Sequence, residues 1–248
     1  MADSQAFFQL DARIQRYLWA EGWDELRDAQ ERAIPLILGA DQDVIIAAAT
    51  ASGKTEAAFL PALTHLLRHE PVTELIVYVS PLKALINDQF ARLLRLCEQL
   101  EISVWPWHGD ISSHAKQKFW KSPTGVLLIT PESLEAMLDN RGSMIAGAFT
   151  RTAYFVIDEL HAFLGTERGK QLQSLMHRIE GLLDRRVPRI ALSATLGDMR
   201  QAAAVLRPGA GDAVALVEST DATQDLRLAL KGYEEPDAAT LKHNVQEG

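Results

Sequence analysis

VIIAAATASGKT, residues 44–55, is the stretch that decides the fold. Its opening residues are apolar and predict a short buried strand, and a helix is expected to begin at Lys54. A Gly-Lys-Thr loop at such a turn cradles phosphate through backbone N–H groups and the Lys54 ammonium, and the Thr55 hydroxyl is placed to hold Mg²⁺. The usual pattern has Gly where this chain has Ala48 and Ala51. We expect a nucleoside triphosphate to contact Thr50, Ala51, Ser52, Gly53, Lys54 and Thr55.

An acidic pair, Asp158-Glu159, follows a second apolar run at residues 153–157. An isolated pair would usually cap the next element, but beside a phosphate loop it has a chemical use. Asp at a strand end can hold Mg²⁺, and Glu beside it can orient or deprotonate the hydrolytic water. His161 follows closely and can link the pair to neighbouring polar groups. We therefore predict Lys54, Asp158 and Glu159 as catalytic residues, and Thr55 and Asp158 as metal ligands.

Apolar strands and helical segments alternate along most of the chain. Near-continuous apolar strands between helices imply a parallel sheet covered on both faces, so we predict a three-layer α/β domain with a mostly parallel central sheet. Ligands bind such sheets at the carboxyl ends of the strands. Each motif described here follows a strand, so all of them are expected at one edge. We expect strands at residues 44–47, 75–79, 102–105, 125–129, 153–157, 189–192 and 213–217, and helices at 6–20, 28–38 (ending at Gly39), 54–69, 84–100, 132–138 and 171–183.

The bulk composition is that of an ordinary globular protein. The chain has 248 residues, of which 47% are hydrophobic and 23% charged, with a net charge of −8. That charge argues against binding nucleic acid by bulk attraction, but it leaves room for a local groove. The single Cys97 excludes a disulfide within the chain and is expected to be a buried apolar group rather than a reactive thiol. No signal peptide or membrane span is visible, so a cytoplasmic location without a membrane partner is expected.

The order and spacing of several short motifs resemble the first motor domain of superfamily 2 DExH/DEAD-box helicases. Gln30 comes first, then the loop at 50–55, SPLKAL at 80–85, TPE at 130–132, DELH at 158–161 and SAT at 193–195. PLKAL, TPESL and the pair Arg168-Gly169 look closest to the large helicase-related (Lhr-like) branch. The resemblance covers most of the chain and implies a RecA-like P-loop NTPase domain that binds ATP and Mg²⁺.

The resemblance also implies a role for each matching residue. Gln30 would recognise adenine, and His161, Ser193 and Thr195 would couple nucleotide state to movement. Arg168 has a second interpretation as a solvated surface residue, and for Trp105 and Trp107 packing in the core is favoured over stacking on bases. The expected nucleic-acid contacts are Pro81, Lys83, Gly109, Thr130, Glu132 and Arg168.

The resemblance further divides the chain. Residues 1–40 would form N-terminal helices carrying Gln30 and packed on the motor domain, 41–206 the RecA-like domain, and 207–248 an extension or linker towards a second motor domain. That second domain, in cis or in trans, would supply an arginine worth roughly 10³–10⁵ in rate, so this chain alone is expected to bind nucleotide weakly and hydrolyse it poorly.

We predict the ATP-binding lobe of a DNA or RNA helicase or translocase, with single-stranded or duplex nucleic acid as partner. Two other classes stay open: a nucleotide-dependent binding or scaffold module without hydrolysis, and a small-molecule phosphotransferase. The intact Lys54, Thr55, Asp158 and Glu159 disfavour the first. The second leaves the motifs at 80–85, 130–132 and 193–195 unexplained.

Overall fold

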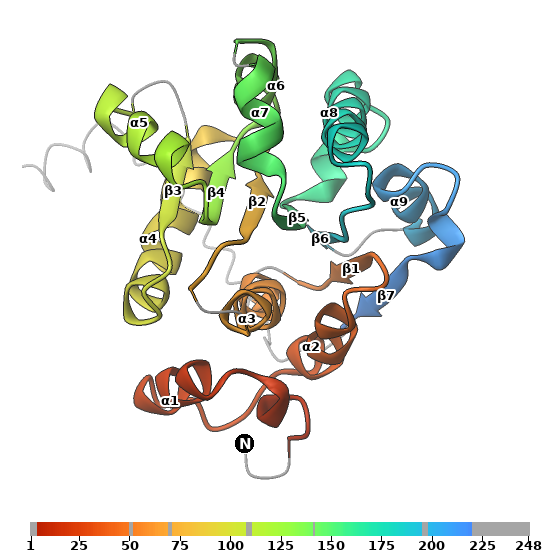
Figure 1. Cartoon of the computed structure of the whole chain (residues 1–248). Coiled ribbons are helices and arrows are strands. Elements are labelled where there is room, and N and C mark those ends of the chain that lie inside the picture. The colour runs from red at the N-terminus through yellow and green to blue at the C-terminus, as the bar shows by residue number, and fades with distance from the viewer. Residues whose placement is uncertain are drawn as a thin grey trace, which may run out of the picture.

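The computed structural model describes residues 4–49, 52–68, 71–107, 111–140, 142–194 and 198–219. Within these residues, seven strands form one all-parallel sheet in the order β3-β4-β2-β5-β6-β1-β7, as Figure 1 shows. The predicted α/β class and parallel sheet are therefore confirmed. The strands are β1 (Val44–Ala47), β2 (Leu75–Val79), β3 (Val104–Trp107), β4 (Gly125–Ile129), β5 (Thr152–Ile157), β6 (Arg189–Ser193) and β7 (Ala215–Glu218).

Helices cover both faces of this sheet, because alternate side chains of each strand point to opposite sides. In β2, Ile76 and Tyr78 join one buried cluster, whereas Val77 and Val79 join the other. One face carries α2 (Asp28–Gly39), α3 (Lys54–Leu67) and α4 (Lys83–Gln99), with α1 (Ala12–Ala20) beyond them; the other carries α5 (Ser113–Lys121), α6 (Pro131–Asn140), α7 (Gly142–Phe149), α8 (Glu167–Leu183) and α9 (Met199–Leu206) (Figure 1). None of the helices in the described residues is long and apolar enough to cross a membrane.

Local hydrogen bonds explain where helix ends differ from the sequence prediction. The helix expected at 6–20 is split, because the Asp11 carboxylate accepts the N–H of Arg13 at 2.9 Å and caps α1, leaving a short 3₁₀ turn at Phe7–Gln9. Gly39 is the last residue of α2 rather than its cap. Ala40, with φ 55°, takes the left-handed position that ends the helix.

Three helices were absent from the prediction. In α5 only Phe119 is buried, and α7 is apolar on most of its surface. The third is α9. The strand expected at 102–105 lies at Val104–Trp107, and the strand expected at 213–217 is the edge strand β7, which pairs with β1.

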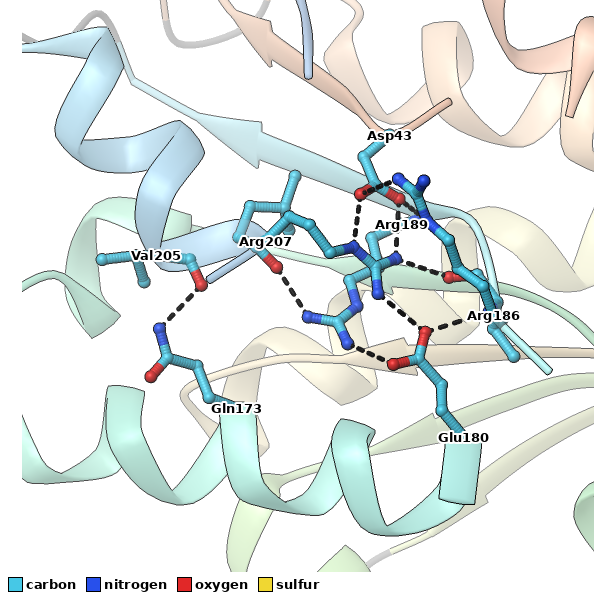
Figure 2. A network of polar contacts seen from close by, with 9 residues as sticks. Asp43, Gln173, Glu180, Arg186, Arg189, Val205 and Arg207 are labelled. Atoms are coloured by element: carbon cyan, nitrogen blue, oxygen red, sulfur yellow. Dashed lines mark hydrogen bonds and ion pairs between the residues drawn. The ribbon is translucent and has the colours of Figure 1, made fainter. Parts of the chain in front are cut away.

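A buried network of charged side chains ties the amino ends of β1 and β6 to α8 and α9 (Figure 2). Asp43, fully buried before β1, accepts two hydrogen bonds from Arg207, Nε to Oδ2 at 2.6 Å and Nη2 to Oδ1 at 2.9 Å. Arg186 Nη2 donates to the same carboxylate at 2.7 Å. Glu180 of α8 accepts from Arg207 Nη1 at 2.8 Å and from Arg189 Nη2 at 2.7 Å. The network fixes the edge of the sheet opposite to the predicted site.

We predict that Arg207→Met lowers the free energy of unfolding by about 3–5 kcal/mol, because it leaves two carboxylates without their shared buried cation. Arg186→Met is the matched control: it removes a hydrogen bond to the same Asp43, but its side chain is 46% exposed. We expect a loss of about 1 kcal/mol or less there. Urea denaturation of both variants measures the difference, and equal losses would contradict the structural role given to Arg207.

The same network predicts how stability responds to acid. Burial alone would raise the pKa of Asp43 and of Glu180. The hydrogen bonds and positive charge of Arg207, together with the other donors and arginines around each carboxylate, outweigh burial and hold both pKa values below their usual range. Because the unfolded chain takes up these protons first, at about pH 4, the stabilisation is complete above that pH and is lost as the pH falls further. The difference in unfolding free energy between the wild type and Arg207→Met should therefore narrow below about pH 4. A constant difference down to pH ~3 would contradict this prediction.

Candidate functional site

Hydrogen bonds that continue beyond the strands bring the predicted motifs to one edge of the sheet. The N–H of Ala48 donates to Ser193 O at 3.3 Å, and the N–H of Asp158 donates to Val79 O at 2.8 Å. The N–H of Ser80 donates to Ile129 O at 3.0 Å. The segments that follow β1, β6, β5, β2 and β4 therefore lie next to one another, as the sequence predicted.

Hydrogen bonds from Lys54 connect the two ends of the phosphate loop at the start of α3. Lys54 is the first residue of the helix, and its Nζ donates to Ala48 O at 2.7 Å and to Ala49 O at 2.8 Å. Burial lowers the Lys54 pKa, and the nearby negative charges of Glu159 and Asp158 oppose that shift. The ammonium and the acidic pair therefore belong to one electrostatic site. Thr50 and Ala51 lie outside the described residues.

Gln30 is fully buried and links α2 to this loop. Its Nε2 donates to Gly53 O at 3.3 Å, and its Oε1 accepts the N–H of Arg27 at 2.9 Å. Gly53 has φ 80°, and a Cβ there would lie 2.5 Å from Gln30 Nε2, so this close approach requires glycine. The structure thus brings Gln30 to the phosphate loop, and its expected contact with adenine stays a prediction.

The acidic pair follows β5, where Asp158 is only 7% exposed. The hydroxyl of Tyr78, on the neighbouring strand β2, donates to Asp158 Oδ2, and the N–H of Glu159 donates to Oδ1 at 3.0 Å. Burial raises the pKa of Asp158 despite these donors. Glu159 takes a left-handed conformation with φ 47°, which is unusual for a residue with a side chain and typical of functional positions.

The side chains at this edge fit a nucleotide phosphate with a bound Mg²⁺. Lys54 supplies a cation, and Thr55 and Asp158 supply the oxygen ligands that Mg²⁺ prefers. Two buried oxygens, Ser52 Oγ and Gln89 Oε1, have no hydrogen-bond partner within the described part of the chain. Buried polar atoms normally have partners, so unpaired oxygens beside the loop are consistent with a polar ligand.

Tyr78 and Gln89 are two site residues that the sequence prediction missed. Tyr78 is the one hydroxyl in the apolar run LIVYV, and Gln89 lies on the buried face of α4, in line with Ile86 and Leu93. Its Nε2 donates to Thr55 Oγ1 at 3.4 Å. Both could have been recognised from the sequence, because each is a polar residue at a position where the apolar pattern predicts burial.

His161 contacts residues of two motifs through one ring nitrogen. Its Nδ1 lies 3.2 Å from Glu159 Oε2, 3.4 Å from Ser193 Oγ and 3.4 Å from the Ala194 N–H. Nδ1 can accept from Ala194 when it carries no proton, or donate to Glu159 when it does. The geometry therefore connects the acidic pair with Ser193. Thr195 lies outside the described residues.

Arg168 joins the segments after β2 and β4. Its Nε donates to Glu132 Oε1 at 2.6 Å and its Nη2 to Pro81 O at 2.8 Å, so it is not simply a solvated surface residue. Burial alone would raise the Glu132 pKa, but the hydrogen bond and positive charge of Arg168, together with hydrogen bonds from the Glu132 backbone and Thr130, outweigh burial and lower that pKa. The next residue must be glycine, because a Cβ at Gly169 would lie 2.0 Å from Phe163 O.

The remaining expected groove residues are placed in part. Thr130 Oγ1 accepts the N–H of Ser133 at 3.3 Å at the start of α6, and Lys83 is exposed at the start of α4. Gly109 lies outside the described residues. Trp105 and Trp107 pack with Phe119, and Trp105 Nε1 donates to Thr124 O at 2.7 Å, which agrees with the favoured interpretation as packing residues.

An all-parallel sheet with a phosphate loop after β1 and an acidic pair after β5 defines a RecA-like P-loop nucleotide-binding domain. Residues 27–203 match the family model described as DEAD/DEAH box helicase, and the chain belongs to that family.

Similar proteins fall in the predicted branch. The chain is 33% identical to the ATP-dependent helicase Lhr-Core of Sulfolobus acidocaldarius over 197 residues, 74% of this chain and 22% of that protein. It is 34% identical to the Lhr helicase/uracil glycosylase of Escherichia coli over 187 residues, 66% of this chain and 12% of that protein. The structure of Mycobacterium smegmatis helicase Lhr bound to ssDNA and AMP-PNP matches with a TM-score of 0.74 and 30% identity, over 86% of this chain and 28% of that one. The chain thus spans about a fifth or less of the curated relatives' length.

We predict that Tyr78→Phe lowers the free energy of unfolding by about 1.5–3 kcal/mol, since Asp158 loses a donor to its buried carboxylate. Tyr154→Phe is a matched control, because Tyr154 is equally buried but donates to the neutral carbonyl of Ile37 at 2.8 Å. A loss of about 1 kcal/mol is expected for that variant. If urea denaturation gives the two variants the same loss, the carboxylate does not depend on Tyr78.

Proposed function

We propose that this chain is the N-terminal ATP-binding lobe of an ATP-dependent DNA or RNA helicase or translocase. One observation carries the proposal: within the described residues, the phosphate loop, the acidic pair and the segments that begin at Ser80 and Thr130 follow strands at one edge of a single parallel sheet. A site for the nucleotide and a path for a strand are therefore adjacent. Family membership and the nucleotide and ssDNA named for the M. smegmatis structure support it.

In this proposal Lys54 binds the β- and γ-phosphates, together with the backbone of residues 50–55. Thr55 and Asp158 hold Mg²⁺, which would neutralise charge on the phosphates, and Glu159 orients the attacking water. Gln30 holds the loop through its hydrogen bond to Gly53 and recognises adenine. Tyr78 and Gln89 orient Asp158 and Thr55 through the hydrogen bonds described above.

His161 is the residue that couples the state of the bound nucleotide to movement of the domain. A change at the γ-phosphate that displaces Glu159 would alter whether His161 Nδ1 faces Glu159 or the backbone of Ala194, and Ser193 and Thr195 would pass this change on. Contacts with the nucleic-acid strand come mainly from the segments after β2 and β4, which Arg168 connects. Pro81, Lys83, Gly109, Thr130, Glu132 and Arg168 track sugar and phosphate rather than bases, so DNA and RNA both fit.

A second RecA-like domain, in cis or in trans, completes the site. It supplies an arginine for the transferring phosphoryl group, which raises the rate by roughly 10³–10⁵ in related chemistry. We propose residues 1–40 as a helical entry carrying Gln30 and 41–206 as the core of the motor domain. Residues 207–248, of which Ala215–Glu218 form β7, are proposed as an extension or linker towards the second domain. A cytoplasmic location is part of the same proposal.

A module that binds nucleotide without hydrolysing it is less well supported, because Lys54, Asp158 and Glu159 are all present at one edge. A small-molecule phosphotransferase is also less well supported, because that function gives no role to the contacts of Arg168 with the segments after β2 and β4.

We predict that Lys54→Ala weakens binding of a fluorescent, non-hydrolysable ATP analogue at least tenfold, because a half-buried cation that binds the phosphates contributes about 1.4 kcal/mol or more. Lys170→Ala is the control: its side chain is 73% exposed and pairs with Glu167 on α8. The same proteins are assayed for ATP hydrolysis with and without single-stranded DNA and RNA.

Slow turnover that either strand changes and that Lys54→Ala abolishes supports a motor lobe. Nucleotide binding equal in all three proteins would exclude the loop as the phosphate site. Nucleotide binding without turnover, even with a second motor domain supplied, would favour the hydrolysis-free module.

A further inference from the structure

The outer face of α5 is a basic surface that the site described above does not use. His114, Lys118 and Lys121, here called the α5 stripe, are spaced by four and three residues and therefore share one side of the helix. All three are exposed. Residues 111–124 also include Lys116 and contain no acidic residue, although the whole chain has a net charge of −8. This segment thus differs in charge from the rest of the protein.

The lysines of this stripe lack the carboxylate partners that several other surface cations have. On other helices, Arg92 contacts Glu56 at 2.7 Å and Arg178 contacts Asp139 at 3.0 Å. Within the residues that the structure describes, Lys118 and Lys121 form no ion pair and no side-chain hydrogen bond. The helix dipole favours cations near a C-terminus, but it does not explain why acidic residues are missing from the whole segment. An external anion would satisfy these charges.

An aromatic cluster holds α5 against the edge strand β3. Trp107 lies 5.3 Å from Phe119 and 6.0 Å from Trp120, ring centre to ring centre. The ammonium of Lys116 lies 5.7 Å from the centre of the Trp107 ring. The stripe is therefore carried by a helix that is fixed in place rather than by a loose loop.

The position of α5 makes it a neighbour of the predicted strand groove. Trp107 is in register with Ile129, the residue before Thr130, so the two strands end side by side. Figure 1 shows α5 beside β3, on the face that also carries α6 and α8. From His114 to Lys121 the helix rises about 10 Å, so the stripe leads away from the carboxyl edge along the outside of the domain.

We propose that the α5 stripe binds the phosphate backbone of the nucleic acid where it leaves the groove. The proposal rests on the proposed function. It extends the nucleic-acid contact surface from the segment after β4 to the helix beside the neighbouring strand, β3. Lysines that act as point charges follow a backbone without reading its sequence, which suits a motor that moves along a strand. An acidic protein would also match the charge, but not the continuity with the groove.

The test measures binding of the full chain to labelled single-stranded DNA and RNA by fluorescence anisotropy over a series of salt concentrations. For Lys118→Ala/Lys121→Ala we expect weaker binding and a plot of log affinity against log salt that is shallower by about 1.4, since each phosphate contact on a single strand contributes about 0.7. The control Arg95→Ala/Arg178→Ala removes the same charge from other exposed positions and should leave the slope unchanged. Circular dichroism verifies that both variants fold.

Each outcome bears on a different claim. If the wild type binds strands and Lys118→Ala/Lys121→Ala binds them with the same slope, the α5 proposal is overturned while the proposed function stands. If the wild type binds neither strand, with or without an ATP analogue, both are overturned. If only binding of polyglutamate changes in the variant, the partner is an acidic protein and the proposal is again overturned.

Discussion

Parallel pairing makes every strand of the sheet end at the same edge, and the candidate site is built from the segments that follow those ends. Hydrogen bonds continue the pairing past the strands, from Ala48 to Ser193 and from Asp158 to Val79. Residues 145 and 79 positions apart in the sequence are thereby held at fixed separations. The phosphate loop and the acidic pair act on each other electrostatically because of this pairing, and the pKa of Lys54 reflects both its burial and the carboxylates.

Three buried polar side chains stabilise that edge from inside the domain. Gln30 donates to Gly53, Gln89 to Thr55 and Tyr78 to Asp158, each from a different element. Polar groups are costly to bury unless they are hydrogen-bonded, so each of these residues has a narrow range of acceptable positions. They orient the groups assigned to the nucleotide, whereas His161 and Arg168, nearer the surface, connect one motif with the next.

Ion pairs between buried side chains stabilise the opposite edge of the sheet, at the amino ends of the strands. Asp43 and Glu180 share Arg207, and with Arg189 they fix the start of β1 and β6 against α8 and α9. Because β1 contains only the residues Val44–Ala47, this network and the phosphate loop lie at the two ends of one short strand. Fixing one end of so short a strand limits how far the other end can move. The flank of the domain at α5 carries basic side chains of another kind, exposed and without carboxylate partners in the described residues.

The sequence by itself determined the fold class and the family, and it predicted most of the residues that the structure brings to the candidate site. Lys54, Asp158 and Ser193 follow apolar strands, and local chemistry is enough to assign a glycine-lysine loop or an acidic pair at a strand end. Tertiary structure decided which groups meet. Arg168 with Pro81 and Glu132, Tyr78 with Asp158, and Arg207 with Asp43 are contacts between elements far apart in sequence, and no periodic pattern encodes them. The basic face of α5 was also missed, because a helix with one buried side chain has too little apolar periodicity to be predicted before its neighbours are known.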